Sequence, residues 1–298
     1  MRKHLINVII LVLLLLPAVC SAVTVVTSFY PVWLMTRSLT EGIDTITVRN
    51  LAAPETGCLH DYTLRPSDMA ILSRADALLI NGSGMESFLP VVLDACPDLM
   101  IVDASDGIPF LAEMETEEIG EEEEEEEGNP HFWLDPARAS LMAGNLATGL
   151  IQIAPEQADR ILANLEFYQS RMKELSAELH RSLADLPSRD VIIFHEALPY
   201  LAEACGLNVI AVVSKESDDA LTTSMLVQLI RFIKDCDVSP LVIKTLEADP
   251  YTEVLAAETG VRFCELNPLT SGPDNPPADY YESVMKENLR ALLEELNP

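Results

Sequence analysis

Basic residues are scarce in this chain of 298 residues. Only 19 lysines and arginines stand against 48 aspartates and glutamates, which gives a formal net charge of −29. Nucleic-acid backbones and anionic lipid surfaces are recognised by clustered positive charge, so both are excluded as partners. A cationic ligand is the natural complement of this chain, because an acidic surface attracts cations and raises their rate of capture.

The chain also has no CxxC or HExxH motif, so a cysteine zinc knuckle is excluded and no local histidine pair fixes a metal site. Of its six cysteines, Cys20 lies near the N-terminus, and the odd number that remains cannot pair completely. Cys236 and Cys264 each lie near an edge of a predicted strand, so they are the first pair to test for a disulfide. Buried free thiols are the alternative.

Long apolar runs are missing except at the N-terminus. There, basic residues precede the apolar run Val8–Leu16, and small residues follow up to Ala22. This order is typical of a secretory signal peptide, here residues 1–22, and the run is shorter than the roughly 20 residues that span a bilayer. A lipid anchor on Cys20 is the alternative. We expect a periplasmic or otherwise extracytoplasmic protein that does not insert into the membrane after cleavage.

Both halves of the remaining chain alternate short apolar or β-branched runs with helix-like stretches. This alternation predicts βαβ units with parallel sheets, and a helical middle section divides them into two α/β lobes rather than one barrel. The predicted strands are Val23–Ser28, Thr45–Asn50, Ala77–Ile80 and Met100–Val102 in the first half, and Val191–Phe194, Val209–Val213, Leu241–Thr245 and Val261–Cys264 in the second.

The middle section is predicted to be entirely helical. One helix begins at Asp135-Pro136, and a second begins at Pro155 and carries an apolar stripe at a spacing of three and four residues. About 30 residues at 1.5 Å each span roughly 45 Å, long enough for a rigid strut between the lobes. The expected division is an N-terminal lobe at 23–153 with an acidic loop at 113–128, a linking helix at 154–186, and a C-terminal lobe at 187–298.

An acidic segment, Glu117–Glu127, precedes this helical section and contains seven consecutive glutamates from Glu121. Like charges at this density repel one another and stay solvated, which predicts a disordered loop. The segment is either a plain spacer or an accessory collector of cations.

Three histidines share a context that suits a metal site. His60 and His195 lie beyond the carboxyl ends of predicted strands, where open α/β sheets bind ligands, and His131 directly precedes a predicted helix. Neutral imidazole is the usual nitrogen ligand of zinc. Spacing alone leaves ordinary core or surface histidines as the alternative, and His180, on the polar side of the long helix, is expected to be a surface residue.

Four segments, in order, resemble the metal-binding solute receptors of ABC transporters. The sequence NPHFWLDP at 129–136 is similar to their NPHxWLDP motif, and CLHDY at 58–62 with RPSD at 65–68 is similar to their PHxY/F…PSD segment. FHEA at 194–197 resembles their FHDA segment, and ETG at 258–260 with ELNPL at 265–269 resembles ETG…LDPL. The resemblance covers essentially the whole chain after the signal peptide.

This resemblance implies a receptor with two α/β lobes joined by one long rigid helix and a metal in the cleft between them. It implies that His60, His131 and His195 are ligands, that zinc is the captured ion, and that a cognate ABC permease and its ATPase are the partners; we expect a monomer. Asn267 stands where many members have Asp, so it is a candidate fourth ligand. Its alternative role is to cap the turn before Pro268.

Several functions remain open at this point. Three imidazoles suit zinc, whereas manganese prefers more carboxylates, so a manganese or iron receptor of the same family is the nearest alternative. A zinc-dependent hydrolase, with Glu196 as general base, belongs to a different class, but no substrate-pocket motif supports it. An adhesin or a metal store without a transporter is a third alternative. We expect a binding protein and no enzymatic activity.

Overall fold

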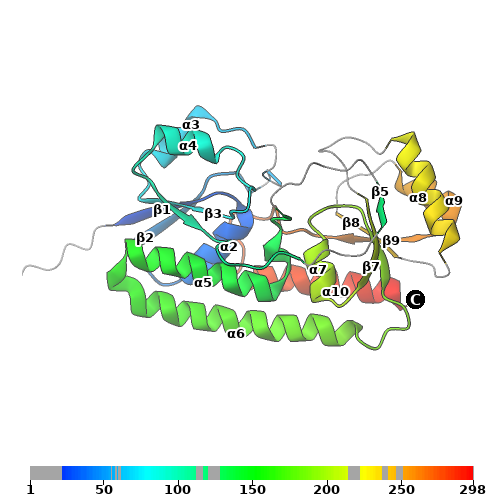
Figure 1. Ribbon diagram of the computed structural model, residues 1–298. Helices are drawn as coiled ribbons and strands as arrows, with labels where there is room; N and C mark the ends of the chain where they lie inside the picture. The colour runs from blue at the N-terminus through cyan, green and yellow to red at the C-terminus, as the bar shows by residue number, and fades with distance from the viewer. Residues whose placement is uncertain are drawn as a thin grey trace, which may run out of the picture.

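The computed structural model describes residues 22–54, 56–57, 59, 62–111, 117–119, 128–213, 222–236, 241–245 and 251–297. His60, and the predicted signal peptide apart from Ala22, lie outside these residues. Within them, no helix combines the length and apolar character needed to cross a membrane. The chain forms two α/β lobes that lie side by side on a layer of long helices (Figure 1).

The first lobe contains a four-stranded parallel sheet in the order β2-β1-β3-β4. Its central strands are continuous apolar runs because both faces of a parallel sheet are covered, and all four residues of β3 are buried. Its strands are β1 (Val23–Thr27), β2 (Ile46–Asn50), β3 (Ala77–Ile80) and β4 (Met100–Asp103), and its helices are α2 (Tyr30–Leu39), α3 (Pro66–Leu72) and α4 (Leu89–Ala95).

The second lobe repeats this plan with a five-stranded parallel sheet in the order β5-β7-β6-β8-β9. The predicted α/β class with two parallel-sheet lobes is therefore confirmed. The strands are β5 (Glu117–Ile119), β6 (Asp190–Ile193), β7 (Asn208–Val213), β8 (Leu241–Thr245) and β9 (Arg262–Leu266), and the helices are α7 (Pro199–Ala204), α8 (Thr223–Asp235) and α9 (Thr252–Thr259).

Strand β5 corrects the prediction that the whole segment Glu117–Glu127 is a disordered loop. Residues 117–119 pair in parallel with 211–213 of β7, at the edge of the second lobe's sheet. Strand pairing uses main-chain groups, and charged sequences are common on edge strands, so the acidic composition does not prevent it. The chain thus leaves the first lobe, adds a strand to the second, and returns to α5. Residues 120–127 lie outside the described part.

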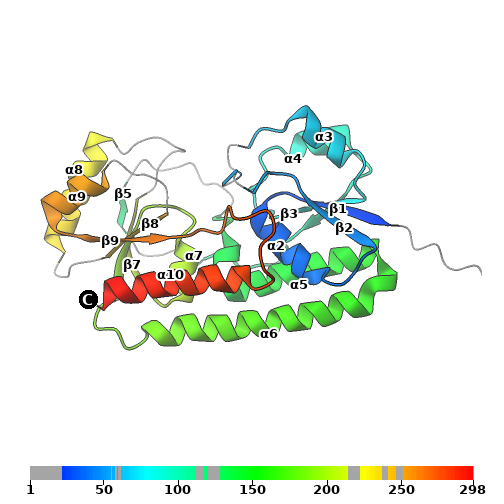
Figure 2. The ribbon, with the colours of Figure 1, turned by 180° about the vertical axis from the view of Figure 1, so that it is seen from behind.

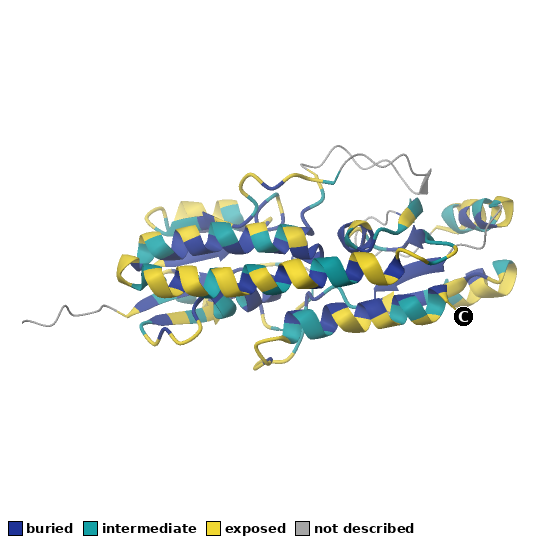
Figure 3. Ribbon diagram, turned by 90° about the horizontal axis from the view of Figure 1, so that it is seen from below, coloured by how far each residue is buried: buried dark blue, intermediate teal, exposed yellow. Residues whose placement is uncertain are grey.

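Three helices brace both lobes from one side: α5 (Pro136–Ile153), α6 (Ala158–Leu183) and α10 (Tyr280–Leu296) (Figures 1 and 2). The 26 residues of α6 extend about 39 Å at 1.5 Å per residue. It packs against α2 and α5 beneath the first lobe and against α7 and α10 beneath the second. Its buried positions follow the predicted apolar stripe, and its outer face is exposed (Figure 3).

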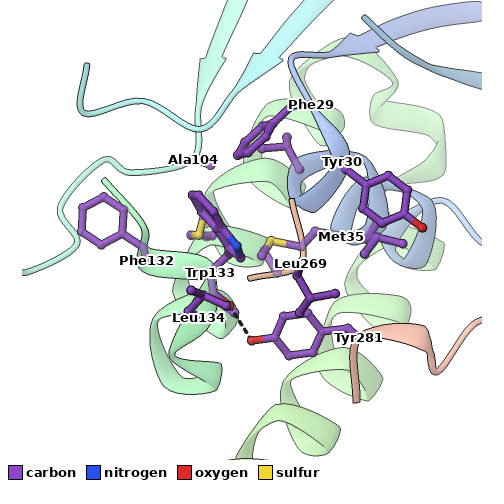
Figure 4. Packing of buried hydrophobic residues seen from close by; sticks show 14 of the residues in the cluster. Phe29, Tyr30, Met35, Ala104, Phe132, Trp133, Leu134, Leu269 and Tyr281 are labelled. Atoms are coloured by element: carbon purple, nitrogen blue, oxygen red, sulfur yellow. Dashed lines mark hydrogen bonds between the residues drawn. The ribbon is translucent and has the colours of Figure 1, made fainter. Parts of the chain in front are cut away.

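Helix α10 was not predicted from the sequence, although it completes the core. The packing centres on Trp133, whose ring meets Phe29 edge-on at 5.1 Å between centroids. The Tyr281 hydroxyl of α10 donates a hydrogen bond of 2.6 Å to the carbonyl of Trp133 (Figure 4). Residues from the N-terminal strand to the C-terminal helix therefore share one hydrophobic cluster.

None of the cysteines in the described part of the chain is in a disulfide: Cys96, Cys205, Cys236 and Cys264. The candidate disulfide between Cys236 and Cys264 is not formed. Cys264 is buried in the main cluster, whereas Cys236 ends α8, whose buried residues belong to a second cluster. The neighbouring Phe263 packs against that second cluster, so Cys264 and α8 lie on opposite faces of β9. Burial raises the pKa of the Cys264 thiol to about 12.

Candidate metal site

Two of the predicted ligands meet where the lobes adjoin. His131 precedes α5, and His195 follows β6 in the second lobe. Their imidazole rings lie nearly perpendicular, with centroids 6.3 Å apart. The third predicted ligand, His60, lies outside the described residues. The sequence therefore identified two histidines, 64 positions apart in the chain, that the fold brings together.

His131 is held in the tautomer that a metal ligand requires. Its Nδ1 lies 2.8 Å from Oδ1 of Asn129, and its backbone N–H donates to the same oxygen at 3.0 Å. The amide nitrogen of Asn129 donates to the carbonyl of Glu196, which fixes the orientation of the amide. Because Oδ1 can only accept, Nδ1 of His131 carries a proton, and in the neutral ring Nε2 is the nitrogen that can bind a metal. The ring is fully buried.

His195 has a different hydrogen-bonding arrangement. The backbone N–H of Ala197 donates to its Nδ1 at 3.1 Å. A neutral ring in this position carries its proton on Nε2. Coordination of a metal through Nε2 would therefore require the ring to turn away from Ala197 and to move its proton to Nδ1. His131 is arranged for coordination as it stands, whereas His195 needs this rearrangement.

The carboxylate of Glu196 approaches His131 from the second lobe. Its Oε1 lies 3.9 Å from Nε2 of His131, and the side chain is about half exposed. Glu196 comes directly after His195, in the turn between β6 and α7. Nε2 of His131 therefore faces a carboxylate oxygen on the other lobe.

A network of polar residues around the NPH segment was not predicted from the sequence. The Tyr200 hydroxyl donates to the carbonyl of Asn129 at 2.7 Å, and the Asn81 amide donates to the carbonyl of Pro130 at 3.0 Å. Glu86 in turn accepts the backbone N–H groups of Asn81 and Gly82. The sequence signal for Asn129 was its position two residues before His131, since Asn often bonds the backbone two residues ahead.

Glu86 is the most deeply buried carboxyl group of this network. Burial raises its pKa from 4.5 to about 7, although the hydrogen bonds from two backbone N–H groups act in the opposite direction. Its side chain holds the turn after β3, which positions Asn81 below the NPH segment. Glu86 is therefore a supporting residue that acts through the backbone of Asn81 and Gly82.

The side chain of Asn267 is engaged in its own turn. Its Oδ1 accepts the backbone N–H of Leu269 at 2.8 Å, and Leu269 adopts a left-handed conformation with φ of 59°. The backbone of Asn267 is tied to Asn288 of α10 by two further hydrogen bonds. This geometry matches the turn-capping role that the sequence left open beside metal coordination.

The described residues alone do not complete a metal site. Among them, no group of three His, Cys, Asp or Glu side chains is arranged to hold a metal ion. A cavity of about 100 Å³ lies elsewhere, between α2, α6 and α10, and none of the predicted ligands lines it. Any metal at His131 therefore needs donors from undescribed positions, from rearranged side chains, or from both.

Two parallel α/β lobes on a long helix, with histidines meeting between them, are the architecture of the metal-binding solute receptors of ABC transporters. The family model described as "ZnuA: Zinc-uptake complex component A periplasmic" matches residues 25–295, so the chain belongs to this family. A crystal structure of ZnuA shares 26% sequence identity and a TM-score of 0.76, covering 93% of this chain and 100% of that chain.

Two of the relatives that this chain matches are named for different metals, one for zinc and one for manganese. The chain is 27% identical over 276 residues to the zinc-binding lipoprotein AdcA of Streptococcus pneumoniae, which covers 90% of this chain and 54% of AdcA. It is 24% identical over 241 residues to the manganese-binding lipoprotein MntA of Halalkalibacterium halodurans, covering 80% and 77%. The chain thus spans about half the length of AdcA. The family resemblance seen in the sequence is confirmed.

Proposed function

We propose that this protein captures zinc outside the cytoplasm and delivers it to an ABC permease for uptake. His60, His131 and His195 are the proposed ligands. The observation that carries the proposal is the meeting of His131 and His195 from opposite lobes, with Nε2 of His131 left ready to coordinate by the bond between Nδ1 and Asn129.

The spacing of the rings supports a shared ion. Two imidazoles on one tetrahedral zinc, at about 2.0–2.1 Å per bond, have ring centroids about 5 Å apart. The observed 6.3 Å is slightly wider, so a small inward movement and the turn of His195 bring both nitrogens to one ion. His60 supplies the third nitrogen in this proposal.

Zinc is favoured over manganese because all three proposed ligands are nitrogens, whereas manganese suits carboxylate and carbonyl oxygen. The similarity to MntA makes a manganese receptor the second candidate. A hydrolase is disfavoured because the family is one of transport components and because Glu196 faces His131 rather than an open substrate position.

The proposal includes the setting in which the receptor works. A secreted monomer, released by cleavage of residues 1–22, would exchange metal with a cognate permease and its ATPase. The family description names a periplasmic component, and AdcA is named as a lipoprotein, so an anchor at Cys20 is the alternative to free release. The acidic segment would collect cations weakly before transfer to the histidines.

Zinc affinity tests the ligand assignment. The protein is purified without chelator, and zinc is titrated in competition with a chromophoric chelator. Loss of one nitrogen ligand should weaken binding by at least about 100-fold in His131→Ala, since even partners of metal ligands account for 10–100-fold. The same titration with manganese separates the two candidate metals.

His180→Ala is the matched control, because His180 is exposed on α6 and is not one of the proposed ligands. It should bind zinc like the wild type. Equal zinc affinity in His131→Ala and the wild type would refute the site. Tighter binding of manganese than of zinc would favour the second candidate.

A further inference from the structure

We propose that Glu196 supplies a carboxylate ligand to the captured ion, beside the histidine nitrogens. This assignment rests on the proposed function and names the donor that completes its site. It replaces Asn267 as the fourth ligand and gives the second lobe two adjacent donors, His195 and Glu196.

The first argument is electrostatic. In the neutral ring, Nε2 of His131 carries the lone pair, because Nδ1 donates its proton to Asn129. That lone pair faces Oε1 of Glu196 across 3.9 Å, and the His131 ring is fully buried. A neutral imidazole nitrogen and a carboxylate oxygen are both electron-rich, so together they attract a cation, whether a proton or a metal ion, to the space between them. A divalent ion at that point attracts both atoms.

The second argument is the distance. Two donor atoms on one tetrahedral zinc, each about 2.0–2.2 Å from the metal, lie about 3.4 Å apart. The observed 3.9 Å needs only a few tenths of an ångström of movement. The Glu196 side chain is half exposed, so it is free of the close packing that would resist this movement.

The third argument is that the side chain of Asn129 links His131 to the turn that carries Glu196. Asn129 binds His131 through its carbonyl oxygen and the Glu196 carbonyl through its amide nitrogen. The Asn129 side chain thus fixes the position of the His131 ring relative to the turn after β6 in the second lobe. Such hydrogen bonds orient metal ligands and tune their affinity.

Two other positions could have supplied an oxygen ligand, but neither has a side-chain oxygen that is available. The Oδ1 of Asn267 already accepts the N–H of Leu269 and caps a left-handed turn. Leu59, which directly precedes His60, is fully buried, and its apolar side chain has no oxygen to offer a metal. Glu196 is the carboxylate that the structure places opposite a coordinating nitrogen. With it, the net charge of the ion and its protein ligands falls from +2 to +1.

The test compares Glu196→Gln with Glu258→Gln. Both glutamates have half-exposed side chains, and Glu258 lies on α9, where it pairs with Lys234 at the far end of the second lobe (Figure 1). Zinc affinity is measured by chelator competition. Cobalt(II) is then bound in place of zinc, because its visible absorption changes when a ligand of the ion changes. Circular dichroism confirms that each variant is folded.

Glu196→Gln should bind zinc about tenfold more weakly or worse and should shift the cobalt absorption, while Glu258→Gln should match the wild type in both. Glu196→Asp keeps a carboxylate on a shorter chain and should recover part of the affinity. An unchanged cobalt spectrum and unchanged zinc affinity in Glu196→Gln would overturn the assignment and leave the proposed function standing. Failure of the wild type to bind zinc would overturn both.

Discussion

At the scale of single residues, the Asn129 side chain makes hydrogen bonds to two segments of the site at once. Its amide group accepts from the backbone and ring of His131 and donates to the carbonyl of Glu196. The same hydrogen bonds select the tautomer of His131 and join the two lobes. An alanine at this position would leave the imidazole free to rotate and to change its tautomer.

We therefore expect Asn129→Ala to bind zinc about 10–100-fold more weakly while keeping its fold, as is typical for lost partners of metal ligands. Asn145→Ala is the matched control. The Asn145 amide also donates two hydrogen bonds, to the carbonyls of Ala104 and Asp106, but it touches neither histidine. It should lose stability and keep wild-type zinc affinity. Chelator competition and thermal unfolding measure the two effects, and equal zinc affinities in both variants would contradict the role of Asn129.

Sequence reasoning reached the histidines but not their partners. His131 and His195 could be selected because imidazole chemistry and a family motif identify them directly. The meeting of His131 with Glu196 depends on how two lobes dock, which no spacing within one segment encodes. From the sequence, Glu196 is only a candidate general base, and Asn267 is a candidate ligand, because many family members have Asp there, with turn capping as the alternative. The hydrogen bond from the Leu269 N–H to Asn267 is visible only in the structure.

At the scale of elements, helix α5 depends on a close approach to β4. A Cβ atom added at Gly149 would lie 2.4 Å from a methyl carbon of Val102, which is far inside van der Waals contact. Glycine at this point lets the helix lie directly on the sheet of the first lobe. Helix α5, which follows His131, can therefore lie this close to β4 because residue 149 has no side chain.

We expect Gly149→Ala to destabilise the protein by about 1–3 kcal/mol, the usual cost of forcing atoms into a packed core. Gly144→Ala on the same helix is the control, because its added methyl group meets no atom within 4 Å. It should stabilise the protein by up to about 1 kcal/mol, since alanine favours helix more than glycine does. Urea unfolding at constant pH measures both changes. Destabilisation of the same size in both variants would contradict the packing argument.

The sequence predicted strands and helices well where their periodicity is strong. Strands β3 and β8 match the predictions residue for residue, and the apolar stripe of α6 is buried as expected. It failed for β5, whose acidic residues look like a solvated loop and whose pairing depends on a free sheet edge. It also missed α10, whose buried residues serve a core that only the docked lobes create.

At the scale of the whole molecule, one hydrophobic cluster includes residues of both sheets and of all three bracing helices. We expect a single thermal unfolding transition, because this cluster is shared by both lobes and the second, smaller cluster packs on the other face of the second lobe's sheet. Zinc at 100 times its dissociation constant adds about 2.7 kcal/mol to the folded state, so the transition should move up by several degrees. Scanning calorimetry with and without zinc measures this. His131→Ala should show the same single transition with no shift, and two transitions of which zinc moves only one would contradict the shared core.

The contacts of Tyr30 have a consequence for biogenesis. The hydroxyl of this α2 residue donates to the carbonyl of Pro273, 243 positions away, and its ring packs against Tyr280 at the start of α10. The first lobe therefore cannot finish its core until nearly the whole chain has emerged from the ribosome. Contacts between residues that are far apart in the sequence slow folding, so the newly made chain stays unfolded for longer. A chain exported through a narrow translocation pore must stay unfolded until it has crossed, and for the export proposed here this late closure would favour that unfolded state.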